Sequence, residues 1–141
     1  MRRVPWVLGN LWTAPNSLLG LLLGVLAVPF GARPRRVAGA LAFCRMPCFT
    51  GALTLGCIVL HRGPTLDVAV PTYAARACHA SAPCVCLGDH EHAHVRQYLV
   101  LGPLFLPVYF LCGGVSARNP LERAADRFAL TGSGWWPWPN Q

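Results

Sequence analysis

Acidic residues are scarce in this chain of 141 residues, and lysine is missing altogether. The chain has five carboxylate side chains and twelve arginines, so its formal net charge is +7. Such a balance can indicate a nucleic-acid binder, but no aromatic-rich basic motif accompanies it, and we do not expect nucleic acid as a partner. The arginines at positions 2–3 and 33–36 flank an apolar stretch, where they suit anionic lipid headgroups, so we expect membrane lipid as a partner.

Pairs of cysteines with C-x-x-C spacing are also missing, although the chain has seven cysteines. An odd number cannot all pair within one chain. Four Cys and His residues precede a histidine cluster and are candidates for a closed structural zinc site or a copper site: Cys78, His79, Cys84 and Cys86. A non-catalytic metal-binding module is therefore one alternative for the function.

The hydrophobic content of 54% exceeds what a single domain of this size needs for its core. Residues 4–32 carry no charge, and residues 17–30 are the most apolar part. Because a bilayer span takes about 20 residues, we expect an N-terminal apolar, transmembrane anchor over residues 1–36, on an undetermined side of the membrane. The alternatives are a cleaved signal peptide and an apolar helix packed on the domain itself.

For the remainder of the chain, the sequence pattern predicts an α+β domain over residues 37–131 and a Trp/Pro-rich tail over 132–141. Two short apolar pieces, Val37–Cys44 and Ala52–Leu60, are bounded by Pro and Gly and predict a β-hairpin. The helices predicted downstream cover about 89–101, 104–112 and 121–130, the last with Pro120 in its first turn.

The sequence His90-Glu91-His92-Ala93-His94 is an H-E-x-x-H motif. On a helix, His90 and His94 share a face, so both imidazoles can bind one zinc ion while Glu91 lies beside the metal-bound water as general base. A catalytic zinc usually has three protein ligands and an open position. Among the few carboxylates, Glu122 on the last predicted helix is the best third ligand.

Asp126 lies one helical turn after Glu122, on the same face. From there its carboxylate can accept a hydrogen bond from the distal nitrogen of a ligand histidine and so fix the tautomer of that ring. Arg96, Tyr98 and Tyr109 are candidates for stabilising an oxyanion, and nothing in the sequence selects one of them.

The motif together with Glu122-Arg123-Ala124-Ala125-Asp126 resembles the zincin metallopeptidases of the gluzincin type. In that type, a downstream helix supplies a glutamate that completes the site, and an aspartate often follows four residues later. The resemblance covers 90–94 and 119–126. It implies a minimal zincin-like domain, a Zn²⁺ cofactor, peptide-bond hydrolysis and a strand at 54–60 that could pair with an extended peptide substrate.

Three classes of function therefore remain: a membrane-associated zinc metallopeptidase, a non-catalytic Cys/His metal-binding membrane protein, and a small membrane scaffold. The first predicts that the general base Glu91 is essential for turnover but dispensable for metal binding. The second leaves Glu91 without a function, and the third predicts no stoichiometric metal.

Overall fold

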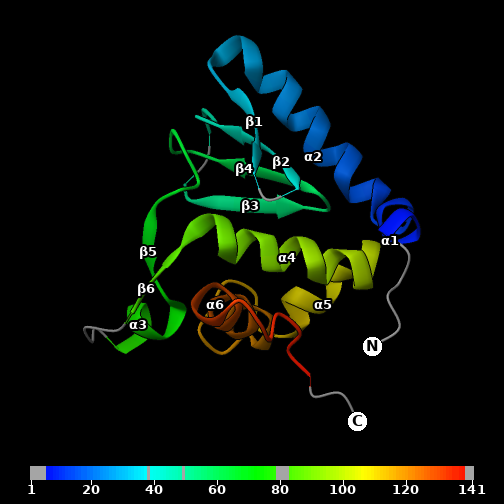
Figure 1. Cartoon of the computed structure of the whole chain (residues 1–141). Coiled ribbons are helices and arrows are strands. Elements are labelled where there is room, and N and C mark those ends of the chain that lie inside the picture. Colours follow the sequence, from blue (N-terminus) through cyan, green and yellow to red (C-terminus); the bar gives the residue numbers. More distant parts are fainter. Residues whose placement is uncertain (1–5, 38, 49, 79–82, 139–141) are drawn as a thin grey trace.

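The chain folds as a mixed α+β domain in which a four-stranded sheet lies between helices (Figure 1). The computed structural model describes residues 6–37, 39–48, 50–78 and 83–138. Helix α2 (Ala14–Ala27) covers one face of the sheet and α4 (Leu87–Leu101) covers the other. Beyond α4, helix α6 (Pro120–Thr131) forms an outer layer. The α+β class predicted from the sequence is confirmed.

The sheet has the strand order β1-β2-β4-β3. Its strands are β1 (Arg33–Val37), β2 (Ala40–Cys44), β3 (Ala52–Leu55) and β4 (Ile58–His61). The two hairpins are β1–β2 and β3–β4, while β2 and β4 pair in parallel. Side chains alternate between the faces, since Ile58 and Leu60 pack toward α2 and Val59 packs toward α4.

The predicted hairpin between 37–44 and 52–60 is therefore wrong in its pairing. The stretch 54–60 is not one strand, because it turns at Gly56 and Cys57 and returns as β4. Gly56 has φ +63°, and a Cβ there would lie 2.1 Å from the Ser17 hydroxyl of α2. Glycine is the residue that allows both the left-handed conformation and this close approach. The turn leaves β3 as an edge strand beside α4.

The N-terminal apolar stretch forms two helices, and the predicted transmembrane helix is wrong. In the described part of the chain, no helix has the length and apolar character needed to cross a membrane. The stretch breaks at Thr13 into α1 (Trp6–Trp12) and α2, which is 14 residues long, and a short 3-10 turn, η1 (Val28–Phe30), follows. Both helices pack on the domain, α1 against α4 and α2 against β3 and β4.

The predicted helices of the second half are confirmed, with small shifts of their ends. Helix α4 begins at Leu87, two residues before Asp89 and within the predicted start, and ends at Leu101. It continues through η2 (Gly102–Leu104) into α5 (Phe105–Leu111). Ahead of α4 lie β5 (Ala69–Pro71), α3 (Tyr73–Cys78) and β6 (Cys84–Cys86).

Helix α6 is fixed against α4 by small side chains and by its N-cap. Ala93 on α4 and Ala124 and Ala125 on α6 are fully buried, which lets the two helices approach closely. The Asn119 side chain accepts a hydrogen bond from the Leu121 amide and donates to the backbone carbonyls of Tyr109, on α5, and of Gly114. The start of α6 is therefore held in place. Glu122, which follows Leu121 in the first turn of this helix, is held in place with it.

The contact between α2 and the sheet gives a stability prediction. A Cβ added at Gly24 would lie 2.2 Å from the ring of Phe43, whereas one added at Gly88 on α4 would meet nothing nearer than 3.5 Å. We expect Gly24→Ala to lower the free energy of unfolding by about 1–3 kcal/mol through overpacking. Gly88→Ala, the matched control, should be neutral or slightly stabilising. Urea denaturation measures both, and equal effects would contradict this packing.

Candidate metal centre

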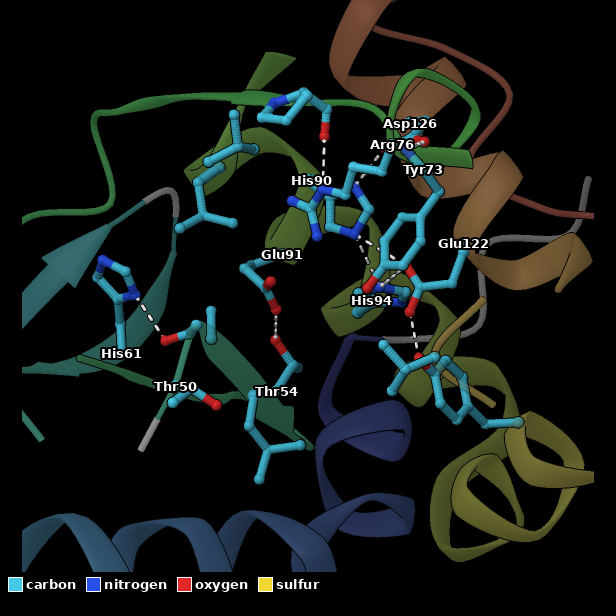
Figure 2. Close-up of a pocket in the computed structure, with 18 of the residues that line it drawn as sticks. Thr50, Thr54, His61, Tyr73, Arg76, His90, Glu91, His94, Glu122 and Asp126 are labelled. Atoms are coloured by element: carbon cyan, nitrogen blue, oxygen red, sulfur yellow. Dashed lines mark hydrogen bonds and ion pairs between the residues drawn. The ribbon is translucent and has the colours of Figure 1, made fainter. Parts of the chain in front are cut away.

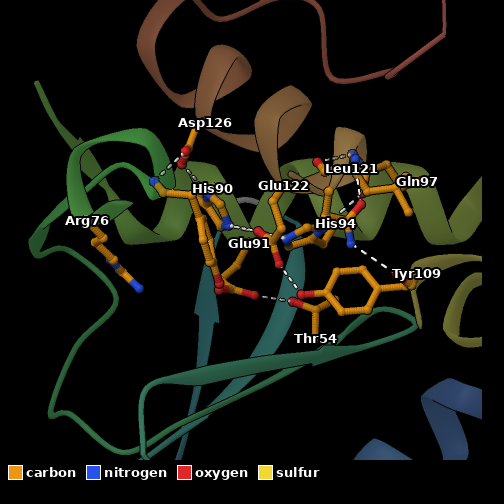
Figure 3. A network of polar contacts seen from close by, with 12 residues as sticks. Thr54, Arg76, His90, Glu91, His94, Gln97, Tyr109, Leu121, Glu122 and Asp126 are labelled. Atoms are coloured by element: carbon orange, nitrogen blue, oxygen red, sulfur yellow. Dashed lines mark hydrogen bonds and ion pairs between the residues drawn. The ribbon is translucent and has the colours of Figure 1, made fainter. Parts of the chain in front are cut away.

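The two histidines of the motif lie on one buried face of α4. His90 and His94 are one helical turn apart, and only 5% and 6% of their surfaces are exposed. Their Nε2 atoms are 3.2 Å apart (Figure 3). Two imidazoles therefore converge on one point, as the i, i+4 spacing requires.

Glu122 reaches the same point from α6. Its Oε2 atom lies 3.0 Å from Nε2 of His90 and 3.2 Å from Nε2 of His94, and its side chain is buried. Bonds of about 2.1 Å to a tetrahedral ion place neighbouring ligand atoms about 3.4 Å apart. The observed triangle is slightly smaller than that, so an ion fits after a small outward movement of the three side chains. This group could hold a metal ion, and it is the only such cluster of three or more in the described residues.

Neighbouring side chains orient both imidazoles. Nδ1 of His90 lies 3.0 Å from an Asp126 carboxylate oxygen, and Nδ1 of His94 lies 2.9 Å from the Gln97 amide oxygen. The Gln97 amide nitrogen donates to the carbonyls of Leu121 and Trp135, which fixes the orientation of the amide. The Asp126 carboxylate and the Gln97 amide oxygen are both acceptors, so each ring must carry a proton on Nδ1. In its neutral form, each ring then directs the lone pair of Nε2 toward the point where the two Nε2 atoms and Glu122 converge.

This arrangement requires a positive charge between the rings. Two lone pairs and a carboxylate oxygen within 3.2 Å repel one another unless a proton or a cation lies among them. Burial by itself lowers the pKa of His90, but the hydrogen bonds with Asp126 and Glu122 outweigh it and raise that pKa to about 10. Burial likewise disfavours the charged form of Glu122, yet the two histidines hold its pKa well below the usual range. The site thus retains a proton when no cation occupies it.

Glu91 lies beside this group and faces a cavity of about 500 Å³ (Figure 2). Its carboxylate accepts a 2.6 Å hydrogen bond from the Thr54 hydroxyl of β3, and the side chain is buried. His90, His94 and Glu122 line the same cavity. The carboxylate expected as the general base and the candidate metal ligands therefore share one space that is open to the outside.

Two tyrosines complete the surroundings of the site. Tyr109 from α5 donates a hydrogen bond to Oε1 of Glu122, so Oε2 is the carboxylate oxygen that could bind a metal ion. Tyr73 at the start of α3 stacks on the His90 ring, with ring centroids 5.9 Å apart, and its amide donates to Asp126 (Figure 2). Burial, and next the charge of Glu122, raise the pKa of the Tyr73 hydroxyl, so this group stays protonated and can act as a donor.

Several predicted roles find no support in this geometry. Tyr98 stacks on Phe105 in the hydrophobic core, with ring centroids 4.0 Å apart, and does not line the cavity. Arg96 lies over the Phe128 ring, which His92 also contacts, so both side chains pack on α6. Tyr109 alone of the three oxyanion candidates reaches the site, where it contacts Glu122.

Three side chains of the site were not predicted from the sequence: Gln97, Thr54 and Tyr73. Gln97 follows His94 by one helical turn on the same face of α4, and this spacing was a signal that could have identified it. Thr54 and Tyr73 come from elements far from α4 in the sequence, and no local pattern indicates them. The alternative Cys/His site includes His79 and the side chain of Cys78, which lie outside the described residues. Cys84 is exposed and Cys86 is partly buried.

The charge balance of the site predicts how stability depends on pH when metal is removed. The pKa of His90 rises from 6.5 to about 10 on folding, so its contribution is complete below pH 6.5 and is lost as the pH rises toward 10. We expect the metal-free protein to lose stability over that range in urea titrations with a chelator present. Asp126→Asn removes the charged partner and should flatten the decline. An equally steep decline in the Asp126→Asn variant would contradict this account.

Comparisons with known proteins leave the site to be interpreted from its own geometry. No family model, curated protein or solved structure matches this chain. The assignments of residues therefore depend on the distances, burial and hydrogen bonds given above.

Proposed function

We propose that this protein is a zinc-dependent hydrolase of peptide bonds. The observation that carries the proposal is the convergence of His90 Nε2, His94 Nε2 and Glu122 Oε2 within 3.2 Å, beside Glu91, in one open cavity. Three protein ligands that leave a position open toward a cavity are characteristic of catalytic rather than structural zinc.

The ligand set favours zinc over other divalent ions. Two imidazole nitrogens and one carboxylate oxygen form a borderline-soft set, whereas Mg²⁺ and Ca²⁺ prefer oxygen ligands alone. The hydrogen bonds from the His90 and His94 rings to Asp126 and Gln97 increase the basicity of the coordinating nitrogens. These partners also fix the ring orientation before any ion binds.

The residues around the site suit the hydrolysis of an amide. When bound, zinc lowers the pKa of a coordinated water toward neutrality and polarises a substrate carbonyl. Glu91 accepts the proton from the attacking water and delivers it to the nitrogen of the leaving amine. Thr54 holds the Glu91 carboxylate at the wall of the cavity through its 2.6 Å hydrogen bond. Thr54 therefore acts as a positioning residue.

Tyr73 is the best-placed donor for the oxyanion. It lines the cavity with His90 and Glu91, and its hydroxyl stays protonated for the reasons given above. A neutral donor aimed at developing negative charge stabilises the transition state more than the ground state. Arg76, one turn later on α3, lies over the Tyr73 ring with its guanidinium carbon 5.0 Å from the ring centroid, and it limits the movement of that ring.

An extended peptide is the substrate class that best suits the cavity. Strand β3 is an edge of the sheet, and Ala52, Leu53 and Thr54 line the cavity beside Glu91. An edge strand has free backbone donors and acceptors, so a substrate strand can pair with it and bring a peptide bond to the site. Phe105, Leu106 and Phe110 give the rest of the cavity an apolar wall that can accept a side chain.

Metal analysis tests the proposed coordination. We expect close to one equivalent of zinc per purified chain, with His94→Ala and Glu122→Ala each losing it, because two ligands do not hold the ion firmly. His92→Ala, on the same helix but packed on Phe128, is the matched control and should keep its zinc. Equal zinc in all four proteins would reject the coordination.

Glu91→Gln separates catalysis from metal binding. The amide keeps an oxygen that can accept from Thr54 but cannot accept the proton, so we expect full zinc content and a kcat lower by about 10²- to 10⁴-fold. Hydrolysis of a quenched fluorescent peptide library measures the loss. Tyr73→Phe should keep zinc and KM but lower kcat by about 10²-fold. An unchanged kcat in Glu91→Gln, at full zinc content, would reject Glu91 as the general base. Full zinc content without measurable hydrolysis by the unchanged protein would favour a non-catalytic metal-binding module.

A further inference from the structure

Helix α2 buries its small residues and exposes its large apolar ones. The residues that face the sheet include Gly20, Gly24 and Ala27, and the glycines contact Ile58 and Phe43 directly. From Leu18 to Leu26 the exposed residues of α2 are all leucine or valine, and Leu22, at the middle of α2, is 56% exposed. A helix that is apolar all round normally lies in a protein core or in contact with lipid. The outward face of α2 therefore lacks a partner within this chain.

The exposed apolar surface extends beyond α2. Helices α1 and α2 both contact η2, which leads into α5, and each of these elements exposes large apolar side chains. We call this surface the apolar face; its exposed members are Val7, Leu8, Leu11, Trp12, Leu18, Leu19, Leu21, Leu22, Leu23, Val25, Leu26, Val28, Phe30, Leu104, Phe110 and Leu111. Exposed apolar patches larger than a few hundred Å² mark sites of interaction with proteins or membranes.

The charge of the chain is concentrated in the same part of the sequence. Residues 1–66 contain seven arginines and no carboxylate side chain, whereas residues 67–141 contain five of each. The first part therefore carries the whole formal charge of +7. A partner of the apolar face must accept apolar side chains and positive charge together.

An arginine-lined hollow includes strand β1, which follows α2 and η1 in the chain. Phe30, which is 76% exposed, ends η1, and the strand β1 that begins three residues later carries Arg33 and Arg35. These two arginines and Arg45 line a cavity of about 390 Å³, and all three are exposed. Guanidinium groups gathered in this way suit a phosphate group.

We propose that the apolar face docks on the surface of an anionic phospholipid bilayer. Helices α1 and α2 lie along the surface with their leucines among the upper acyl chains, as interfacial helices do. Arg33, Arg35 and Arg45 bind headgroup phosphates, and Trp12 lies at the headgroup level that tryptophan favours. A second copy of this chain is a poorer partner, because a shared apolar face would bring two sets of arginines together without any carboxylate.

This docking would place the candidate site next to the bilayer. Phe110 belongs to the apolar face and also lines the cavity that contains Glu91. The resulting preference for peptides at a membrane surface depends on the proposed function, whereas the docking itself does not. Lipid binding alone therefore decides whether the docking occurs.

Vesicle flotation tests the docking with the full chain. We expect it to float with vesicles of phosphatidylglycerol and phosphatidylcholine, and to bind far less to phosphatidylcholine alone or at high salt. Leu22→Glu should weaken binding at least about tenfold, because it removes buried apolar area. Arg35→Gln should weaken it about fivefold through the lost charge. Leu130→Glu and Arg123→Gln, both at exposed positions of α6, are the matched controls and should bind as the unchanged protein does.

Three results would overturn the docking. They are equal binding to neutral and anionic vesicles, equal losses in the α6 controls, and a stable dimer in sedimentation that Leu22→Glu dissociates without any vesicle binding. Circular dichroism shows whether each variant is folded. Binding that fails while zinc content and Glu91-dependent hydrolysis persist would reject the docking and leave the proposed function standing.

Discussion

The structure depends on a buried carboxylate held between two imidazoles. Glu122 is 2% exposed, and burial of an unpaired carboxylate would be very costly. Its charge is offset by a proton or a cation shared with His90 and His94. The elements around it serve this contact: alanines let α6 approach α4, Asn119 fixes the first turn of α6, and Tyr109 binds the second carboxylate oxygen. A site that retains a proton and could hold a metal ion is thus built into the contact between two helices.

Local sequence patterns predicted the two helices that make the site. The i, i+4 spacing of His90 and His94 defines one face of a helix, and Pro120 after Asn119 marks a helix start. The scarcity of carboxylates made Glu122 and Asp126 conspicuous, and the structure places both beside the histidine pair. Residues that share a regular element are the ones whose relative positions a sequence determines.

The other parts of the site depend on tertiary packing, which no local pattern encodes. Thr54 meets Glu91 because the chain turns at Gly56 and makes β3 an edge strand beside α4. Tyr73 meets His90 because α3 packs on α6. The N-terminal stretch was misjudged for a related reason. Its length and lack of charge predict a span, but its glycines follow one helix face and pack on the sheet.

We claim that three ligand atoms would surround a metal ion at one point in the molecule. X-ray diffraction from crystals of the zinc-loaded protein, with anomalous data on both sides of the zinc absorption edge, tests this claim directly. We expect one strong anomalous peak about 2.0–2.2 Å from His90 Nε2, His94 Nε2 and a Glu122 carboxylate oxygen. The fourth coordination position of the zinc should face Glu91. A zinc peak elsewhere, or one at this point with four protein ligands and no open position, would contradict the claim.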